Sequence, residues 1–496
     1  MKKFILFFVI IIGIFPINNI CASKVRAFLS YATFYSPEQG PYIETYLVVM
    51  GKSVMFKKNE KNTYQGKLKI TMLFKQGDLI KNFKKYELLS PEVSDSTKIN
   101  VNFIDQQRFS LPNGSYLFEM LISDSNCDTI PFSVSQPLEI NYNTDSVFIS
   151  GIQLIEKYKK TKESNILSKS GYDFIPYVSD YFPENMDTIA FYTEIYNTNK
   201  GLGTDQKYLL SWDIESFETG KVINDFIRYK KENAQSINVL FNQFNIKGLP
   251  SGNYYLAIKL KDQNNKIIAS NKLFFQRNNP NVQLNLNDIS SLSIENTFVA
   301  AFTNKDTLLD YIYSLTPIST GMEKTFVFSQ LKKSDITIMQ QYFYNFWKKR
   351  DELEPEKAWE NYHILVMKVN DSYSTGIRRG YDTDRGRIYL EYGMPDVIIA
   401  KPFGKASVGG NAVSLPYEIW KYHKLGENQR NRKFVFCNSD MAHNAYELIH
   451  SDADGELKNY NWSSMMYRGI YNNVNASMER PMGESTGTND AFFEEE

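Results

Sequence analysis

The segment LPNGSYLFEMLISD at residues 111–124 recurs as LPSGNYYLAIKLKD at residues 249–262. Each copy opens with a Pro/Gly turn, and after the turn every second residue is large and apolar. These residues are Tyr116, Phe118, Met120 and Ile122 in the first copy, and Tyr254, Leu256, Ile258 and Leu260 in the second. A period of two after a turn signal predicts a half-buried β-strand in each copy.

The sequence around the two copies also matches. Ile43–Met50 and Ile189–Tyr196 are both rich in aromatic and β-branched residues, which favour strands. The run ending at Gly77 resembles the run ending at Gly220.

Short strands separated by turn signals are typical of a β-sandwich. We therefore expect a multidomain, mainly β chain in which two Ig-like β-sandwiches, at residues 24–140 and 145–280, arose by duplication. The alternative is that two unrelated sandwiches share the turn and the tyrosine strand by chance.

The N-terminus has the pattern of a signal peptide. Lys2 and Lys3 precede an apolar run from Phe4 to Phe15; Pro16 and a short polar stretch then lead to the small residues Cys21-Ala22-Ser23. The run is shorter than the roughly 20 residues that a transmembrane helix needs. We expect a signal peptide at residues 1–23, cleaved near Ser23, and an exported protein that is periplasmic or associated with the outer membrane. An alternative interpretation makes Cys21 a lipid-anchored first residue.

The charge balance excludes some classes of partner. The chain has 56 basic and 56 acidic residues, so neither sign dominates. An even balance does not indicate binding to nucleic acid or to an anionic membrane. No other stretch is long and apolar enough to span a bilayer.

Past residue 280 the periodicity becomes helical. We expect a helical connector at 281–330, which includes a helix at Asp306–Leu315. A second helix follows at Asp335–Arg350, with Ser334 as its N-cap. Pro355 is well placed in the first turn of a third helix, whose buried face is Trp359, Tyr362, Val366 and Val369.

Strand-like runs follow the third helix, at Val397–Ala400, Tyr417–Tyr422, Lys433–Cys437 and Tyr446–His450. Helices followed by strands indicate an α+β domain at 331–475. The acidic segment 482–496, with its run of Gly, Ser and Thr, is expected to be disordered.

One motif in this domain is distinctive. Residues 380–396 read GYDTDRGRIYLEYGMPD, and FWKKRD stands upstream at 346–351. Together with PYEIW at 416–420, they resemble the GWxTD family of exported proteins of the Bacteroidota. Tyr381 stands where that family has its name-giving Trp. The resemblance implies an α+β domain and brings no established reaction with it.

The motif has a structural interpretation of its own. Thr383 can cap a short helix, Asp384 lies favourably at the helix N-terminus, and Gly393 ends the helix. Arg385 and Arg387 can pair with carboxylates and hold the helices against this turn. The candidate carboxylates are Asp351, Asp396 and Glu391.

A functional interpretation uses the same residues. Asp382, Asp384 and Glu391 would line a cleft with the two arginines and bind an anion or perform acid–base chemistry. The motif supplies no nucleophile, so we assign no catalytic residue. The motif residues that remain candidates for a structural or ligand-binding role are Gly380, Tyr381, Thr383, Asp384, Arg385, Arg387, Glu391, Asp396, Trp347, Arg350 and Asp351.

Other chemistry finds little support in the sequence. The spacing of Cys437, His443 and His450 matches no zinc pattern, and we expect His450 at the surface, at the end of a strand. We expect no cofactor and no metal.

The first functional hypothesis is a non-catalytic cell-envelope module that binds envelope proteins. The alternatives are an envelope polymer hydrolase acting at GYDTDRGR and a glycan-binding module.

Overall fold

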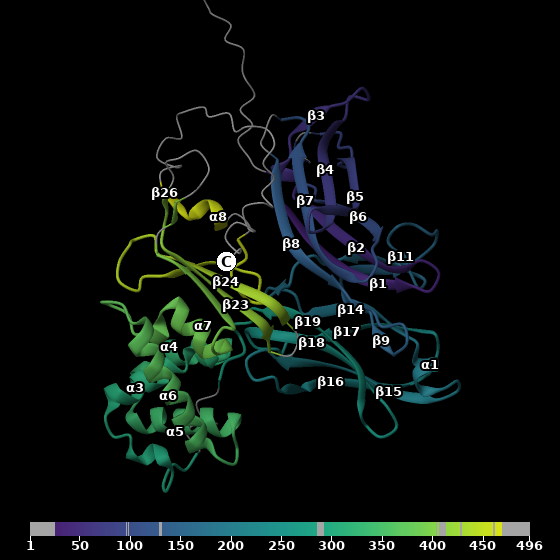
Figure 1. Cartoon of the computed structure of the whole chain (residues 1–496). Helices are drawn as coiled ribbons and strands as arrows, with labels where there is room; N and C mark the ends of the chain where they lie inside the picture. The colour runs from purple at the N-terminus through teal and green to yellow at the C-terminus, as the bar shows by residue number, and fades with distance from the viewer. Residues whose placement is uncertain are drawn as a thin grey trace, which may run out of the picture. The chain divides into compact units, whose positions relative to one another are not determined.

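A computed structural model describes residues 25–95, 97, 99–127, 131–284, 292–402, 404–405, 413–426, 429–459 and 462–468. The expected signal peptide and the expected disordered tail lie outside these residues. The chain is a multidomain, mainly β protein with a helical region in its C-terminal part, as predicted (Figure 1).

The chain divides into two compact units. The first comprises the described parts of residues 1–29, 47–105 and 118–134. The second comprises 30–46, 106–117 and the described residues from 135 onward. The finer assignment of Ig-like domains at 24–140 and 145–280 stays a prediction.

The N-terminal third contains the short helix η1 (Gly51–Ser53) and a series of strands. They are β1 (Ala27–Ser36), β2 (Gly40–Val49), β3 (Phe56–Lys58), β4 (Tyr64–Gln76), β5 (Leu79–Leu89), β6 (Phe103–Ser110), β7 (Gly114–Asp124) and β8 (Phe132–Ile140). One sheet has the order β1-β2-β6, and another has the order β3-β4-β7-β8 with β5 paired to β4.

The next stretch forms two sheets that share a core. One has the order β11-β12-β10-β14-β17 and the other β13-β19-β18-β15-β16. The strands are β9 (Phe148–Ile149), β10 (Gln153–Lys160), β11 (Ser168–Lys169), β12 (Tyr172–Pro176), β13 (Tyr181–Phe182), β14 (Thr188–Tyr196), β15 (Lys207–Ser216), β16 (Val222–Asn233), β17 (Ile237–Asn245), β18 (Gly252–Lys261) and β19 (Ile267–Arg277), with helix α1 (Thr198–Leu202) between β14 and β15. Side chains of both sheets meet in this core, among them Phe191 and Trp212, so the two sheets pack as a sandwich.

The repeated segment forms equivalent strands. The predicted apolar faces of β7 and β18 are buried. In both copies the tyrosine after the turn donates back to the proline carbonyl, Tyr116 to Pro112 over 2.8 Å and Tyr254 to Pro250 over 3.0 Å. The two copies therefore share this local hydrogen bond, and their origin by duplication stays a prediction.

The helical region begins at η3 (Phe298–Ala301). It continues with α3 (Lys305–Ser314), η4 (Thr316–Ile318), α4 (Gly321–Ser329), η5 (Leu331–Lys333), α5 (Ile336–Arg350), α6 (Pro355–Tyr373), η6 (Gly380–Asp382) and α7 (Asp384–Tyr392). Pro355 opens α6, as predicted. The N-cap of α5 is Asp335 and not the predicted Ser334, because the Asp335 carboxylate accepts from the N–H of Ile338 over 2.9 Å.

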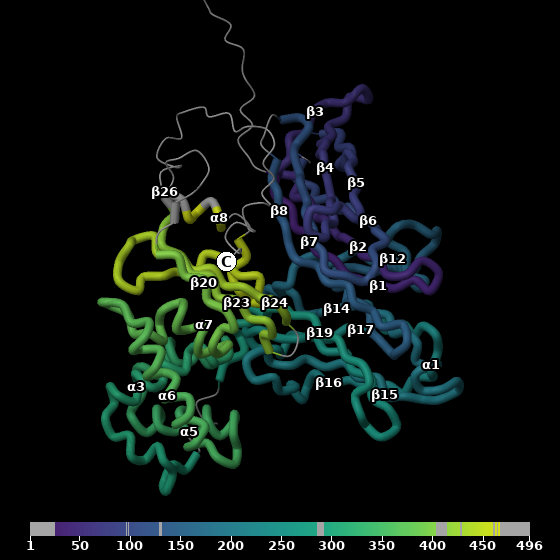
Figure 2. Tube along the Cα trace, in the orientation of Figure 1, coloured from purple at the N-terminus to yellow at the C-terminus, as the bar shows by residue number. Residues whose placement is uncertain are grey.

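A four-stranded sheet follows in the order β20-β23-β24-β25. Its strands are β20 (Val397–Lys401), β23 (Tyr417–Leu425), β24 (Gln429–Cys437) and β25 (Glu447–Ser451); β21 (Gly404–Lys405), β22 (Val413–Ser414), α8 (Trp462–Met465) and β26 (Tyr467–Arg468) complete the described chain, whose course Figure 2 traces. Trp420 and Phe434 join the helices in one core that begins at Val299, within the expected connector. Among the described helices, none combines the length and apolarity needed to cross a bilayer.

Candidate functional site

The GYDTD segment makes a close turn between α6 and α7. Gly380 and Gly386 are both buried, and a Cβ on either would overlap main-chain atoms: those of α6 at Gly380, and those of Gly380 at Gly386. Thr383 is the N-cap of α7, as predicted, and its Oγ1 accepts from the N–H of Gly386 over 3.2 Å. Small residues at these two positions are therefore required by the packing.

Tyr381 connects the turn to two helices. Its hydroxyl donates to Asp310 Oδ1 of α3 over 2.7 Å, and its N–H donates to Asn370 Oδ1 of α6 over 3.2 Å. Burial and the hydrogen bond to Asp310 raise the pKa of the Tyr381 hydroxyl. A tyrosine here ties the turn to two helices.

Arg385 is almost completely buried and lies between α7 and the sheet. Its guanidinium donates to Glu418 Oε1 of β23 over 2.8 Å and to Asn444 Oδ1 over 3.1 Å. The guanidinium also lies over the ring of Tyr446, 4.2 Å from its centroid. None of the three carboxylates proposed from the sequence is its partner, so that prediction is wrong for Arg385.

Arg387 joins two carboxylates. It bonds Glu391 one turn further along α7 over 3.1 Å, as predicted, and it bonds both oxygens of Glu456 over 2.7 and 2.8 Å. Tyr392 also donates to Glu456 over 3.2 Å. Burial and the nearby Glu456 carboxylate raise the pKa of Glu391 to about 7, although Arg387 opposes the shift.

The remaining acidic residues of the motif have separate roles. Asp384 accepts from the N–H of Leu448 in β25 over 2.8 Å. Asp396 accepts from the N–H of His423 over 2.6 Å and does not pair with an arginine. Asp382 is exposed and pairs with Arg378 at the surface. The structure therefore does not gather these carboxylates around one point.

The upstream FWKKRD segment packs into the helical core. Trp347 is buried in α5 against Trp359. Arg350 donates to both carboxylate oxygens of Glu323, over 3.1 and 2.9 Å, and lies over the ring of Phe346. Asp351 accepts from the backbone N–H of Glu354 over 2.9 Å, so it caps the following turn. The predicted pairing of Asp351 with Arg385 or Arg387 is therefore wrong.

Sequence reasoning missed the partners of these arginines. Glu418, Glu456 and Glu323 lie 33, 69 and 27 residues away from the arginines that they bind. Residues so far apart in sequence follow no local spacing that would predict their pairing. PYEIW, which contains Glu418, was connected with the motif only through the resemblance to GWxTD proteins.

A second charged cluster was also missed. Tyr42-Ile43-Glu44-Thr45-Tyr46 in β2 and Tyr192-Thr193-Glu194-Ile195-Tyr196 in β14 share a Tyr-x-Glu-x-Tyr pattern. Glu44 is fully buried and binds Lys169 Nζ at 2.7 Å and Arg108 Nε at 2.7 Å. In β14 the two tyrosine hydroxyls donate to Glu194. A glutamate between two tyrosines on a strand was the available signal.

Lys169 is enclosed in this cluster. Its ammonium lies 3.5 Å from the centroid of the Phe34 ring and donates to Gln153 Oε1 over 3.2 Å. Burial lowers the pKa of Lys169, although Glu44 opposes this shift. The cluster joins strands that are far apart in sequence, which is a structural role.

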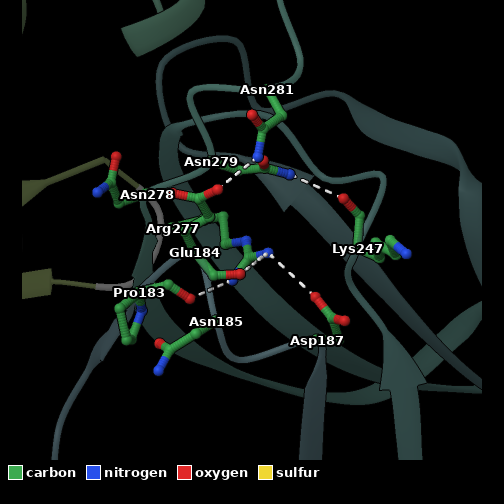
Figure 3. Close-up of a pocket in the computed structure, with 9 residues that line it drawn as sticks. All are labelled: Pro183, Glu184, Asn185, Asp187, Lys247, Arg277, Asn278, Asn279 and Asn281. Atoms are coloured by element: carbon green, nitrogen blue, oxygen red, sulfur yellow. Dashed lines mark hydrogen bonds and ion pairs between the residues drawn. The ribbon is translucent and has the colours of Figure 1, made fainter.

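A cavity of about 550 Å³ lies at the ends of β13, β17 and β19 (Figure 3). It is lined by Pro183, Glu184, Asn185, Asp187, Lys247, Arg277, Asn278, Asn279 and Asn281. The buried Arg277 donates to the carbonyls of Pro183 and Met186 over 2.6 Å each. Its charge therefore holds the 183–186 loop, and the wall of the cavity contains no residue of the GYDTD motif.

The histidine at 450 differs from expectation. His450 is 3% exposed, stacks on Trp462 and accepts from the N–H of Asn459 over 3.2 Å, so the predicted surface position is wrong. The chain turns back after β25, since the N–H of Ser451 donates to the carbonyl of Leu457, and this brings Asn459 to His450. Burial lowers the pKa of His450 to about 3, and two nearby lysines add to this effect.

No family model matches the chain, and no curated protein matches it. Solved structures that match part of the chain weakly include fibronectin(III)-like modules of CbhA from Clostridium thermocellum, with 8% identity, 49% of this chain and 89% of that chain covered, and a TM-score of 0.14. A calcium-binding mutant of β-glucuronidase 2 from Bacteroides uniformis has 8% identity, with 51% of this chain and 32% of that chain covered, and a TM-score of 0.15. A β-glucosidase from Kluyveromyces marxianus has 10% identity, with 49% and 46% covered, and a TM-score of 0.13.

Proposed function

We propose that this protein is an exported, non-catalytic module that binds or assembles other proteins of the cell envelope. The main support for the proposal is that the arginines of the two motif segments are bound to carboxylates of the protein itself. Arg350, Arg385 and Arg387 each bind carboxylates of their own domain. Arginines that are paired with carboxylates inside the protein fit a structural role better than a catalytic one.

The exposed strand edges of the β-rich part support binding. β5 and β16 each pair with a single strand in the sheet orders of the described residues. Phe83 on β5 is 64% exposed and Tyr229 on β16 is 72% exposed. Exposed aromatic side chains on free strand edges are typical of surfaces that bind other chains.

The compartment rests on the N-terminal sequence pattern. A positive start, a short apolar run and small residues favour export to the periplasm or to the outer membrane, with cleavage near Ser23. Labelling exported protein with a palmitate analogue separates a soluble chain from one anchored through Cys21.

Two experiments test the proposal. The first isolates complexes from the native envelope after mild crosslinking, and the expected result is a partner that recurs between preparations. Failure to recover one contradicts the proposal.

The second experiment measures stability and envelope-polymer hydrolysis for Asp384→Asn and Arg385→Ala. Loss of stability is expected, whereas loss of a hydrolytic activity at unchanged stability supports an enzyme with its site at GYDTDRGR.

A glycan-binding role is a second candidate, favoured by one group of aromatic rings. Tyr158 is 46% exposed, and its ring lies 4.7 Å from Phe241 and 6.1 Å from Tyr172. A glycan array with the wild-type chain and with Tyr158→Ala tests it. Signals that depend on Tyr158 support this candidate, and an array without signals removes it.

A further inference from the structure

Basic residues concentrate in one part of the N-terminal sequence. Residues 56–89, which contain β3, β4 and β5, hold nine lysines and three acidic residues, a net charge of +6. The whole chain is balanced at 56 basic and 56 acidic residues. All of residues 56–89 belong to one compact unit, in which Lys61 and Lys75 pair with Glu92 and Glu119 from outside the segment. The remaining lysines of the segment, among them Lys81 and Lys85 on β5, keep its surface basic.

The edge strand of this segment is long and exposed. β5 has 11 residues, and β4 is the strand with which it pairs in the described part of the chain. Leu79, Phe83 and Leu89 are 59%, 64% and 51% exposed. An unpaired strand edge with apolar side chains is a template for another strand.

The outward face of β5 carries two charged side chains, Lys85 and Glu87, between two apolar ones, Phe83 and Leu89. The register places Phe83 opposite Leu73, Lys85 opposite Thr71 and Leu89 opposite Lys67. The other face of β4 carries Leu68, Ile70, Met72 and Phe74, all fully buried. An added strand would therefore meet the outward row Phe83, Lys85, Glu87 and Leu89 with its own alternate side chains.

A basic hollow continues this surface at the end of β5. It has a volume of about 490 Å³ and is lined by Lys57, Lys58, Asn59, Gln65, Lys67, Glu87, Leu89 and Asn126. Lys67 and Glu87 neutralise each other at 2.7 Å. Lys57 and Lys58 remain in excess, so the hollow is suited to an acidic side chain.

We propose that β5 accepts an additional β-strand from an acidic, extended segment of a partner protein. This inference rests on the proposed binding function and specifies its partner. Lysines on a strand edge repel a second copy of the same edge, but they attract an acidic strand. The main-chain groups of the edge supply affinity, and the lysines and Phe83 supply specificity.

The composition of the segment favours a protein over a phosphate polymer. Residues 56–89 contain no arginine, whose planar fork is the preferred group for phosphate recognition. A nucleic acid or an anionic lipid would also leave the open strand edge unpaired. An acidic strand would pair with the lysines through its carboxylates and with the open edge of β5 through its main-chain groups.

The test uses the full exported chain and a fluorescent peptide of about ten alternating Glu and Val residues, close to the upper length of strands. Fluorescence anisotropy measures binding to the wild type, to Lys81→Glu with Lys85→Glu, and to Phe83→Ser. The matched control is Lys230→Glu with Lys231→Glu on β16. We expect saturable binding that weakens about tenfold in the Lys81/Lys85 variant and little in the control.

Hydrogen exchange locates the bound peptide. Saturating peptide should slow exchange of the amides in residues 80–89, because the added strand covers that edge. Absence of saturable binding, an equal loss in the β16 control, or no added protection in β5 overturns the inference. Tighter binding of single-stranded DNA or of anionic vesicles overturns the assignment to a protein.

The two proposals fail separately. If envelope crosslinking recovers the same partner with the wild type and with the Lys81/Lys85 variant, the binding function stands and the β5 site is wrong. If crosslinking recovers no partner while the peptide binds at β5, the site stands and the envelope function is wrong.

Discussion

Arg385, in the first turn of α7, donates to Glu418 of β23 over 2.8 Å, although 33 residues separate the two in sequence. Arg385 is 4% exposed, and the Glu418 side chain is 15% exposed. This pair connects the GYDTD turn to the sheet. It explains an arginine in the motif without a catalytic role.

Breaking that pair should destabilise the protein strongly. Arg385→Ala leaves Glu418 partly buried without its cation, which costs about 3–5 kcal/mol of unfolding free energy. Urea denaturation measures this loss. The double variant Arg385→Met with Glu418→Met should recover much of it, because no unpaired charge remains.

The matched control for Arg385 is Arg378→Ala. Arg378 pairs with Asp382 at the surface, where the side chains are 43% and 64% exposed. Its removal should cost less than about 1 kcal/mol. Equal effects of Arg385→Ala and Arg378→Ala would contradict the structural role of Arg385.

A methyl group at Gly386 should be poorly tolerated. A Cβ at this position overlaps the carbonyl of Gly380, so Gly386→Ala should cost about 1–3 kcal/mol or more. Gly376 has open space around its Cβ direction and is the control. Thermal unfolding of the two alanine variants checks the prediction, and equal melting temperatures would contradict the close packing.

Stability should fall in mild acid because of His450. Its pKa is about 3 in the folded chain and about 6.5 when unfolded, so the unfolded state binds a proton that the folded state excludes. The contribution of His450 is complete above pH about 6.5 and is lost as the pH falls toward 3. The slope is about 1.4 kcal/mol for each pH unit.

The prediction for His450 is checked by comparing how the free energy of unfolding depends on pH in two variants. The free energy of unfolding is measured from pH about 7 to about 4 for the wild type and for His450→Asn. The asparagine variant should lack this part of the slope. Parallel curves would mean that His450 is protonated in the folded protein.

The buried lysine of the Tyr-x-Glu-x-Tyr cluster gives a further test. Lys169→Met removes one of the two cations that bind the fully buried Glu44 and leaves only Arg108, which is 43% exposed, so it should cost about 3 kcal/mol. Adding Glu44→Gln should reduce the loss, because a neutral amide then replaces a buried carboxylate that has kept only one of its two cations, Arg108. A double variant that is less stable than Lys169→Met would contradict this account.

Local patterns predicted much of the fold for a physical reason. Alternation in β7 and β18, the Thr383 cap and the Pro355 start are properties of neighbouring residues, so they can be read without the tertiary structure. The N-cap of α5 was predicted at Ser334 and lies at Asp335, an error of one residue. Helix ends predicted from sequence are uncertain by a residue or more.

The sequence by itself determined the repeated strands, the helical region and the turn at residues 380–396, because steric preferences and hydrophobic periodicity act over a few residues. Only the tertiary structure decided which carboxylates meet Arg385 and Arg387, that Glu44 meets Lys169, and that His450 is buried. Those contacts depend on where distant strands and helices pack, since a charge takes whichever partner the fold brings within a few ångströms.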